Sequence, residues 1–485
     1  MAMPTVTYTP QLGYAGADSF TFRAFDGTDS SAPPALVTLS VELASLPCGA
    51  FVSGSIGAIG EVDTYRFVGQ AGRIITLAVA SAGGFTTGQS VSSSALLTLL
   101  APDGAVVGRL RSNSQGNFTL PATGTYMVRV NASNLRNTGS YNVSLHCLFP
   151  STPGTPVLQC GALQAGTITA PGKVDLYAFA GQAGQIISLA LASTGGFSTG
   201  QNISSSALLT LFAPGGVSLG SLRSNSQVNF TLAATGTYVL RVSASNLGNT
   251  GSYNVSLHCL VPATPGTPLL QCGALQAGTI TAPGDVDLYA FAGQAGQIIS
   301  LALGNTGGFS TGQNISSSAL LTLFAPGGAS MGSLRSNSQV SFTLPATGTY
   351  VVRVSASNLG NTGSYNVSFH CLLPPTPGTP MLQCGALQAG TITAPGDVDL
   401  YSFVSAFGHT VTLTLASTGG FSTRRNITSS ALLTFFAPDG SLLGSLRSDS
   451  QANFTLPATG TYVVRVNASN LGNTGSFNVG LICPS

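Results

Sequence analysis

Pairs of aspartates recur in the sequence and are the first candidates for chemistry. Asp285 and Asp287 stand in the segment GDVDLY, and Asp397 and Asp399 stand in a copy of that segment. Calcium takes about six to eight oxygen ligands, so paired carboxylates are candidates for a calcium site. A further copy carries Lys173 in place of one acid, which a required ligand pair would not tolerate. We therefore expect each aspartate to order its own turn, with calcium as the alternative and no other cofactor.

Two further patterns are typical of catalytic or metal sites but lack the partners that such sites need. The segment GFSTG, at 196–200 and 308–312, matches the hydrolase pattern G-x-S-x-G. That pattern works on a strand–turn–helix with a histidine partner, and the sequence predicts neither. His146, His258 and His370 share one recurring position with no further ligand nearby, so we expect solvent-facing strand residues. The sequence therefore predicts no catalytic site, and we expect the protein not to be an enzyme.

Arginine recurs at one position before a valine, as Arg129, Arg241, Arg353 and Arg465. Because only 6% of the residues are charged, an arginine in every copy indicates a specific partner. We expect that partner to be the turn aspartate of the same copy. The alternative is a carboxylate or sugar of a bound ligand.

N-x-S/T sequons are frequent and make the protein a candidate for glycosylation. Their asparagines are Asn117, Asn131, Asn142, Asn202, Asn229, Asn254, Asn314, Asn366, Asn426, Asn453 and Asn467. In the segments NFTL and SYNVSLHC the asparagine alternates with apolar residues, so its side chain should point outward when theirs point inward. We expect covalent glycans on some of these sites, with Ser- or Thr-linked sugar as the alternative.

Eight cysteines form four equivalent pairs. The pairs are Cys48 with Cys147, Cys160 with Cys259, Cys272 with Cys371, and Cys384 with Cys483. Bonds within these pairs would tie the first strand of a domain to its last, which contributes about 4–5 kcal/mol in the loop-entropy model. The alternative joins each closing cysteine to the next opening one and leaves Cys48 and Cys483 free to link chains. We favour the first pairing, and either one indicates an oxidising, extracellular setting.

The chain of 485 residues is built from a long internal repeat. The closing cysteines stand at positions 147, 259, 371 and 483, a constant step of 112 residues, which is typical of a whole domain. Short runs of alternating or β-branched residues are separated by Gly, Pro, Asn or Asp, as in antiparallel β-sandwiches. We predict an all-β protein with sandwiches at 46–149, 158–261, 270–373 and 382–485. The T-P-G-T-P segments between them should be extended, semi-rigid spacers.

Residues 1–45 differ from the repeats. The series YTP, GYAGADSFTFRAFDG and ALVTLSVE resembles the closing half of bacterial Ig-like or cadherin-like repeats. Two or three strands cannot bury a face alone, so we expect this partial Ig-like segment to pair with an upstream part, the first repeat or another molecule. The last option would give head-to-tail self-association. The opening MAMPTVTYTP lacks the features of a signal peptide, and we expect the true N-terminus of an exported protein to lie upstream or to have been removed.

Composition excludes several classes of protein. Charged residues make up 6% of the chain and the net charge is +2, so the clustered Lys and Arg of a nucleic-acid groove are absent. No apolar run approaches the ~20 residues of a membrane-spanning helix. A protein with so few surface charges stays soluble more easily if sugars or neighbouring subunits cover its surface.

The order of motifs in each repeat closely resembles the bacterial pre-peptidase C-terminal domain. These motifs are G-x-x-D-x-Y-x-F, then L-T-L-x-A-P-x-G, then A-T-G-T-Y-x-x-R-V and T-G-S-(Y/F)-N-V. The resemblance implies a jelly-roll-like sandwich found on secreted proteins. In many relatives it is appended to extracellular peptidases, and similar collagenase segments bind collagen, some with calcium.

We expect a non-enzymatic extracellular structural protein. It would be an elongated, glycosylated stalk or the subunit of a surface filament that assembles head to tail. The alternative is a collagen- or polysaccharide-binding accessory region of a secreted hydrolase, which would need an exposed aromatic platform. Trp is absent, but Phe85, Phe197, Phe309 and Phe421 in the loops are candidates for that platform.

Overall fold

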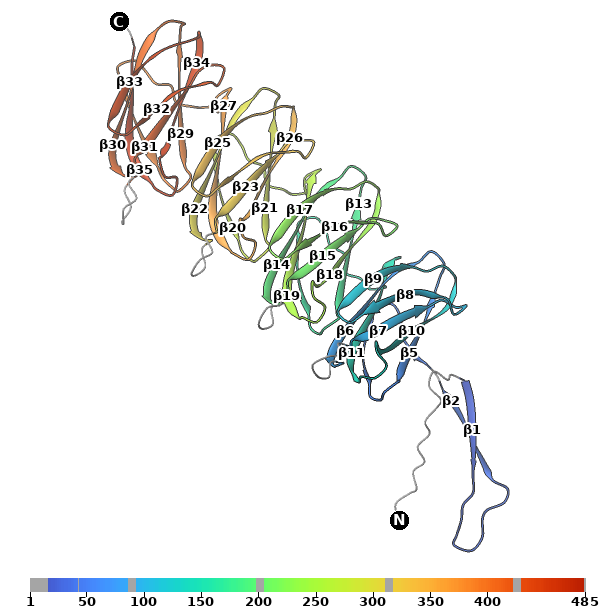
Figure 1. The fold of residues 1–485 in the computed structure, drawn as a ribbon. Helices are drawn as coiled ribbons and strands as arrows, with labels where there is room; N and C mark the ends of the chain where they lie inside the picture. The colour runs from blue at the N-terminus through green and yellow to red at the C-terminus, as the bar shows by residue number, and fades with distance from the viewer. Residues whose placement is uncertain are drawn as a thin grey trace.

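The computed structural model describes residues 16–41, 43–85, 93–197, 205–309, 317–421 and 429–483. The regular elements within these ranges are β-strands, and no helix there could span a membrane. Four domains of the same design follow one another in an elongated, slightly curved row, and a hairpin projects from the N-terminal end (Figure 1).

Each repeat contributes eight strands to its sandwich. Those of the first repeat are β4 (Ala50–Ile56), β5 (Val62–Gly69), β6 (Ile74–Gly84), β7 (Ala95–Leu100), β8 (Val106–Arg111), β9 (Ser114–Thr119), β10 (Gly124–Ala132) and β11 (Gly139–Phe149). Those of the second are β12 (Ala162–Ile168), β13 (Val174–Gly181), β14 (Ile186–Gly196), β15 (Ala207–Phe212), β16 (Ser218–Arg223), β17 (Ser226–Thr231), β18 (Gly236–Ala244) and β19 (Gly251–Val261). Those of the third are β20 (Ala274–Ile280), β21 (Val286–Gly293), β22 (Ile298–Gly308), β23 (Ala319–Phe324), β24 (Ser330–Arg335), β25 (Ser338–Thr343), β26 (Gly348–Ala356) and β27 (Gly363–Leu373). Those of the fourth are β28 (Leu387–Ile392), β29 (Val398–Ser405), β30 (Thr410–Gly420), β31 (Ala431–Phe436), β32 (Leu442–Arg447), β33 (Ser450–Thr455), β34 (Gly460–Ala468) and β35 (Gly475–Ile482).

The eight strands form two four-stranded antiparallel sheets that pack face to face. In the second repeat one sheet, here called sheet I, has the order β12-β19-β14-β17, and the other, sheet II, has the order β13-β18-β15-β16. The other repeats follow the same order, which in strand positions is 1-8-3-6 and 2-7-4-5. This is the double-sheet arrangement of a jelly roll. The predicted tandem array of jelly-roll-like sandwiches is therefore confirmed.

The core of each sandwich follows from alternation along the strands. In β18 the side chains of Tyr238, Leu240 and Val242 point inward and are fully buried. Tyr253 on β19 extends the core, and its hydroxyl lies 2.9 Å from that of Tyr177. Only glycine fits at position 166, because a Cβ there would lie 2.3 Å from the Tyr253 ring. The glycine of the opening strand therefore makes room for a buried tyrosine pair.

A two-stranded hairpin precedes the first repeat. It consists of β1 (Gly16–Phe22) and β2 (Ala35–Val41), and the short β3 (Ala44–Ser45) then pairs with the edge strand β5 of the first sandwich. Phe22 and Leu36 are 50% and 63% exposed, and none of the hairpin residues whose burial is described is fully buried. The Ig-like character of this segment stays a prediction.

A disulfide closes each sandwich. The bonds are Cys48–Cys147, Cys160–Cys259, Cys272–Cys371 and Cys384–Cys483, each with a sequence separation of 99 residues. Each bond ties the residue before the first strand to the last strand, as favoured from the spacing. The alternative pairing across the linkers does not occur.

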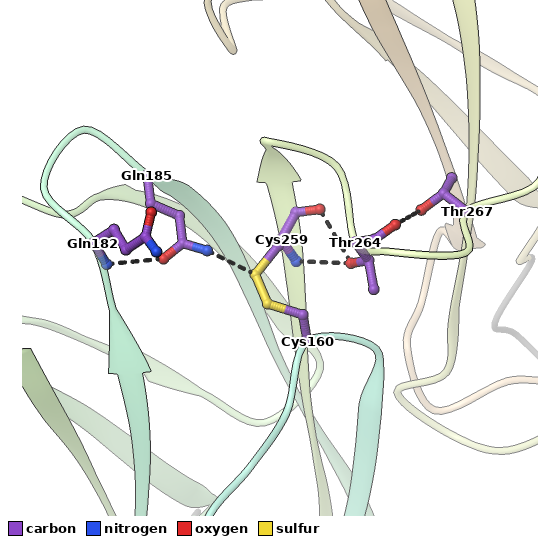
Figure 2. The surroundings of a disulfide bond; sticks show 6 residues. All are labelled: Cys160, Gln182, Gln185, Cys259, Thr264 and Thr267. Carbon is purple, nitrogen blue, oxygen red and sulfur yellow. Dashed lines mark hydrogen bonds between the residues drawn. A yellow bond between two sulfur atoms is a disulfide. The ribbon is translucent and has the colours of Figure 1, made fainter.

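The linkers depart from expectation. Thr264 lies in the second T-P-G-T-P segment, and its hydroxyl accepts a hydrogen bond from the amide of Cys259 (3.2 Å), as Figure 2 shows. Thr267 then donates to the carbonyl of Thr264 (2.6 Å), and Leu269 forms a bridge with Ala290 of the next repeat. The segment is thus a folded turn fixed to the disulfide of one repeat and the sheet of the next. The prediction of extended spacers was wrong, because threonine hydroxyls and backbone groups satisfy one another within the turn.

Removal of one disulfide should weaken one sandwich and leave the others folded. A C272A/C371A variant opens a loop of 99 residues, which the loop-entropy model values at about 4–5 kcal/mol. We expect faster hydrogen exchange throughout β20 and β27, measured by mass spectrometry, while β4 and β11 exchange as in the unaltered chain. Equal exchange of β27 in both proteins would contradict the prediction.

Candidate functional site at the repeat junctions

The aspartates singled out from the sequence are bound within their own repeats. Asp285 accepts hydrogen bonds from the amide and hydroxyl of Thr281 (2.9 and 2.7 Å). Asp287 accepts one from the Tyr365 hydroxyl (2.5 Å), and burial raises its pKa. Among the described residues no group of three His, Cys, Asp or Glu could hold a metal ion.

The last repeat shows what the tyrosine contributes. Phe477 replaces the tyrosine there, so the carboxylate of Asp399 loses that hydrogen bond. Burial and the neighbouring charge of Asp397 then raise the pKa of Asp399 to about 6. In the other repeats the tyrosine hydroxyl stabilises the carboxylate, which is a structural role.

Consecutive repeats touch through the outer faces of their sheets. At the junction of repeats 2 and 3, small side chains of sheet I, Ala190 and Ala192, contact Val286 and Leu288 of sheet II in the next repeat. Apolar clusters of equivalent residues occupy the other two junctions, with Gly304 in place of the second alanine at the third. The protein is therefore a continuous stack of sheets rather than a string of separate domains (Figure 1).

Burial patterns show how closed these junctions are. From Ile187 to Ala192 every residue of β14 is buried, on both faces of the sheet. The equivalent stretch of β30 in the fourth repeat, which no described repeat covers, alternates between buried and more exposed positions. The next repeat thus shields the weakly charged outer face of sheet I from solvent.

The recurring arginines lie in the junctions. Arg353 on sheet II of repeat 3 stacks on the ring of Phe324 at 5.0 Å. It also donates to Ser188 (3.0 Å) and Asn229 (2.8 Å), both on sheet I of repeat 2. Burial lowers the pKa of Arg353 to about 10, which leaves it charged at neutral pH. The prediction of an aspartate partner in the same repeat was wrong, because the guanidinium points across the junction.

Arg241 and Arg465 repeat this arrangement over Phe212 and Phe436, at 5.1 Å in both cases. Arg129 in the first repeat has no preceding repeat and is exposed. The same residue type is thus buried at interior positions and solvated at the end of the stack.

Two predictions about outward-pointing side chains are corrected by the junctions. Asn254 is 8% exposed, and its amide donates to the carbonyl of Pro283 in the next repeat (2.8 Å). Asn142 and Asn366 make the same contact with Pro171 and Pro395. These asparagines point out of their own sandwich, as alternation requires, but into the neighbouring one. A glycan on any of them is incompatible with the stacked arrangement.

The histidines are also junction residues and not solvent-facing. His258 and His370 are 6% and 7% exposed. Burial lowers the pKa of His258 to about 4, and the charge of Arg353 acts in the same direction while Asp285 opposes it. The imidazole is therefore neutral at pH 7.

A shallow cavity of about 270 Å³ lies beside His258. It is lined by the linker residues Pro265 and Pro268 and by Asp287 and Tyr289 of the next repeat. Cavities of the same construction lie at the other junctions. They offer hydrogen bonds to a small polar molecule. At the first two junctions the carboxylate is already bound to the tyrosine described above, whereas Asp399 at the third lacks that bond.

The remaining candidates divide by position. Asn117, Asn229 and Asn453 are exposed, Asn131 is partly exposed, and Asn467 is 3% exposed. Asn202, Asn314, Asn426 and the Ser positions of GFSTG lie outside the described residues. The loop phenylalanines Phe85, Phe197, Phe309 and Phe421 are at most 2% exposed, so they provide no aromatic platform.

Sequence comparison identifies the repeats. The model of the bacterial pre-peptidase C-terminal domain matches residues 61–132, 173–244 and 285–356. The first three repeats are pre-peptidase C-terminal domains in tandem. The fourth repeat, outside those matches, has the same strand order. Domains of this family are found in secreted proteins, and four disulfides fit an oxidising environment.

Several solved structures are similar to parts of the chain. The pre-peptidase C-terminal domain of a Bacillus anthracis collagenase is 17% identical over 21% of this chain and 94% of its own, with a TM-score of 0.18. PliG, a periplasmic inhibitor of g-type lysozyme from Aeromonas hydrophila, is 22% identical over 21% of this chain and 97% of its own (TM-score 0.16). The CUB1-EGF-CUB2 region of human MASP-1/3 is 9% identical over 43% of this chain and 99% of its own (TM-score 0.15). No curated protein sequence matches the chain.

Acidification should weaken the junctions. An unfolded histidine binds a proton near its ordinary pKa of about 6.5, whereas folded His258 does so only near about 4. Between these values the unfolded state binds more protons, so stability falls as the pH falls, by up to about 3 kcal/mol per buried histidine. The raised pKa of Asp287 opposes this loss at the acid end of the range.

Thermal melts between pH 7 and pH 4.5 test this dependence. We expect the melting temperature to fall less with pH in a H258Q variant than in the unaltered chain. The exposed His409 provides the matched control, because H409Q should leave the profile unchanged. Identical profiles for H258Q and the unaltered chain would contradict a neutral, buried imidazole.

Glycosylation should follow exposure and not the sequon alone. In a host that modifies sequons, glycopeptide mass spectrometry should find sugar at the exposed Asn453 and none at Asn254, whose amide is bound across the junction. A folded, straight protein with full occupancy at Asn254 would show that the junction does not form as described.

Proposed function

We propose that the protein is a non-enzymatic extracellular rod that holds whatever is attached to its two ends at a fixed separation. The observation that supports this most directly is the face-to-face packing of sheets at all three junctions. Each fully buried Leu, Val or Phe side chain contributes roughly 1.5–3 kcal/mol, and bending the rod requires some of these contacts to open. A stalk is the role that such stiffness serves.

Two finer features belong to this proposal. Glycans on exposed sequons would cover the polar, weakly charged sides of the rod, as at Asn453. The N-terminal hairpin would be the attachment element, since among the described residues β2 pairs with β1 alone and an added strand could use its other edge. A filament would result if the added strand came from a second copy.

The second candidate is the accessory region of a secreted hydrolase that binds collagen or polysaccharide. Family membership favours it, because domains of this family occur on secreted proteins. The burial of the loop phenylalanines removes the aromatic platform that it would need. Pull-down on collagen and on insoluble polysaccharide separates the two candidates, since a pure stalk is retained by neither.

Truncation of a single junction arginine should introduce a hinge. R353A removes the stacking on Phe324 and two charged hydrogen bonds. The junction should lose about 2 kcal/mol of stabilisation, because the cost of burying the guanidinium offsets part of these interactions. Electron microscopy of single molecules should show straight four-domain rods for the unaltered chain and bending between repeats 2 and 3 for the variant.

The control is R335A, which removes an exposed arginine of the same repeat. Its rods should be as straight as those of the unaltered protein. Bending at every junction of the unaltered chain would refute the rod, and R353A rods without any added bend would refute the role of the arginine.

A further inference from the structure

Repeats 2 and 3 carry the same residues at three positions on the sheet II side, and the leucine among them belongs to the apolar cluster at the junction with the preceding repeat. Leu176, Ala178 and Gly248 on the sheet II side of repeat 2 recur as Leu288, Ala290 and Gly360 in repeat 3. The leucines and alanines are buried at 8% exposure or less. A Cβ on Gly248 would lie 3.4 Å from the side chain of Asn113 in the preceding repeat, so this position has little room.

The first repeat differs at these three positions. It carries Thr64, Arg66 and Arg136 in place of the leucine, alanine and glycine. Threonine brings a hydroxyl into an apolar contact, and an arginine at the glycine position would have to displace the asparagine of a preceding repeat. A further repeat stacked on this face would therefore meet a hydroxyl in place of the apolar leucine and a long side chain in place of the glycine.

The sheet I side of the last repeat differs in a matching way. Ile298 and Ala302 of repeat 3 are replaced by Thr410 and Thr414. The Ile298 side chain fills the space over Gly440 of the next repeat, where a Cβ would lie 2.0 Å from its Cδ1. Thr410 cannot fill that space with apolar atoms, and Thr414 puts a larger, polar side chain where Ala302 is 1% exposed.

We propose that these substitutions are end caps, so that neither end of the stack accepts another repeat of this kind from any chain. Without caps, the last repeat of one chain could stack on the first repeat of another, and repeated contacts of this kind would build a fibre. Repeat proteins with polar outer faces on their end repeats avoid this. The number of interior repeats then sets the length of the rod. Whatever precedes or follows the four sandwiches attaches by other surfaces. The inference goes beyond the proposed rod, because it concerns which surfaces a second copy can use.

Removal of the caps in the full chain tests this. One variant, T64L/R66A/R136G, opens the first face, and another, T410I/T414A, opens the last face. In sedimentation experiments, the unaltered chain and each variant alone should show no end-to-end association through these faces. An equimolar mixture of the two variants should form complexes of twice the mass. Adding R129E to the first variant should abolish these complexes, because Arg129 occupies the position of the junction arginines. A mixture without complexes would overturn the proposal, as would complexes of the unaltered chain that R129E dissolves.

A second test does not depend on association or on the folding of the end repeats. The cap residues are moved into an interior junction as L288T/A290R/G360R. We expect electron micrographs with a bend between repeats 2 and 3, whereas the same kinds of change at exposed sites of that repeat, L275T/A292R/G327R, should leave the rod straight. Straight rods in the first variant would show that these residues do not oppose stacking and would overturn the proposal. This outcome is distinct from failure of the rod itself, which would appear as bending in the unaltered chain.

Discussion

The contact on which the rest of the structure depends is the packing of sheet I of one repeat on sheet II of the next. An antiparallel sheet usually has one face in water, which permits charged residues on alternate positions. Here the interior sheets are buried on both faces, so both sets of alternate positions must be apolar, small or hydrogen-bonded. The low proportion of charged residues, 6%, follows from this double burial. A lysine or glutamate at most of these positions would face another sheet at about 10 Å rather than solvent.

The buried arginines fix the direction of the stack. A guanidinium removed from water is costly unless an aromatic ring and acceptors replace its hydration. Phe324 belongs to the same repeat as Arg353, but Ser188 and Asn229 belong to the preceding one, so the set is complete only when repeats meet in one order and register. The hydrogen bonds across the junction therefore contribute specificity to the stack.

The sequence predicted each sandwich well and the junctions poorly. The runs of alternating and β-branched residues predicted antiparallel sandwiches, and the disulfides that form are the ones favoured from the cysteine spacing. The other face of the same sheets carries Ala, Ser and Asn, which are equally compatible with water and with a close neighbour. Asn254 and His258 were therefore assigned to solvent, and only the position of the next repeat shows otherwise. An apolar residue on the outward face, such as Val239, was the signal that could have indicated a second buried surface.

The linker and the disulfide explain why the junctions need little additional energy to persist. Thr264 binds the backbone of Cys259 (Figure 2), and the same linker pairs with β21 of the next repeat. The short linker is therefore bound at both ends and keeps the two facing sheets close together. Their effective concentration is then high, and even modest contacts stay closed. The end faces of the stack have no such tether, so an intermolecular copy of the junction would have to form from free solution. A few substitutions at an end face can therefore be sufficient to prevent the same contact from forming between two separate chains.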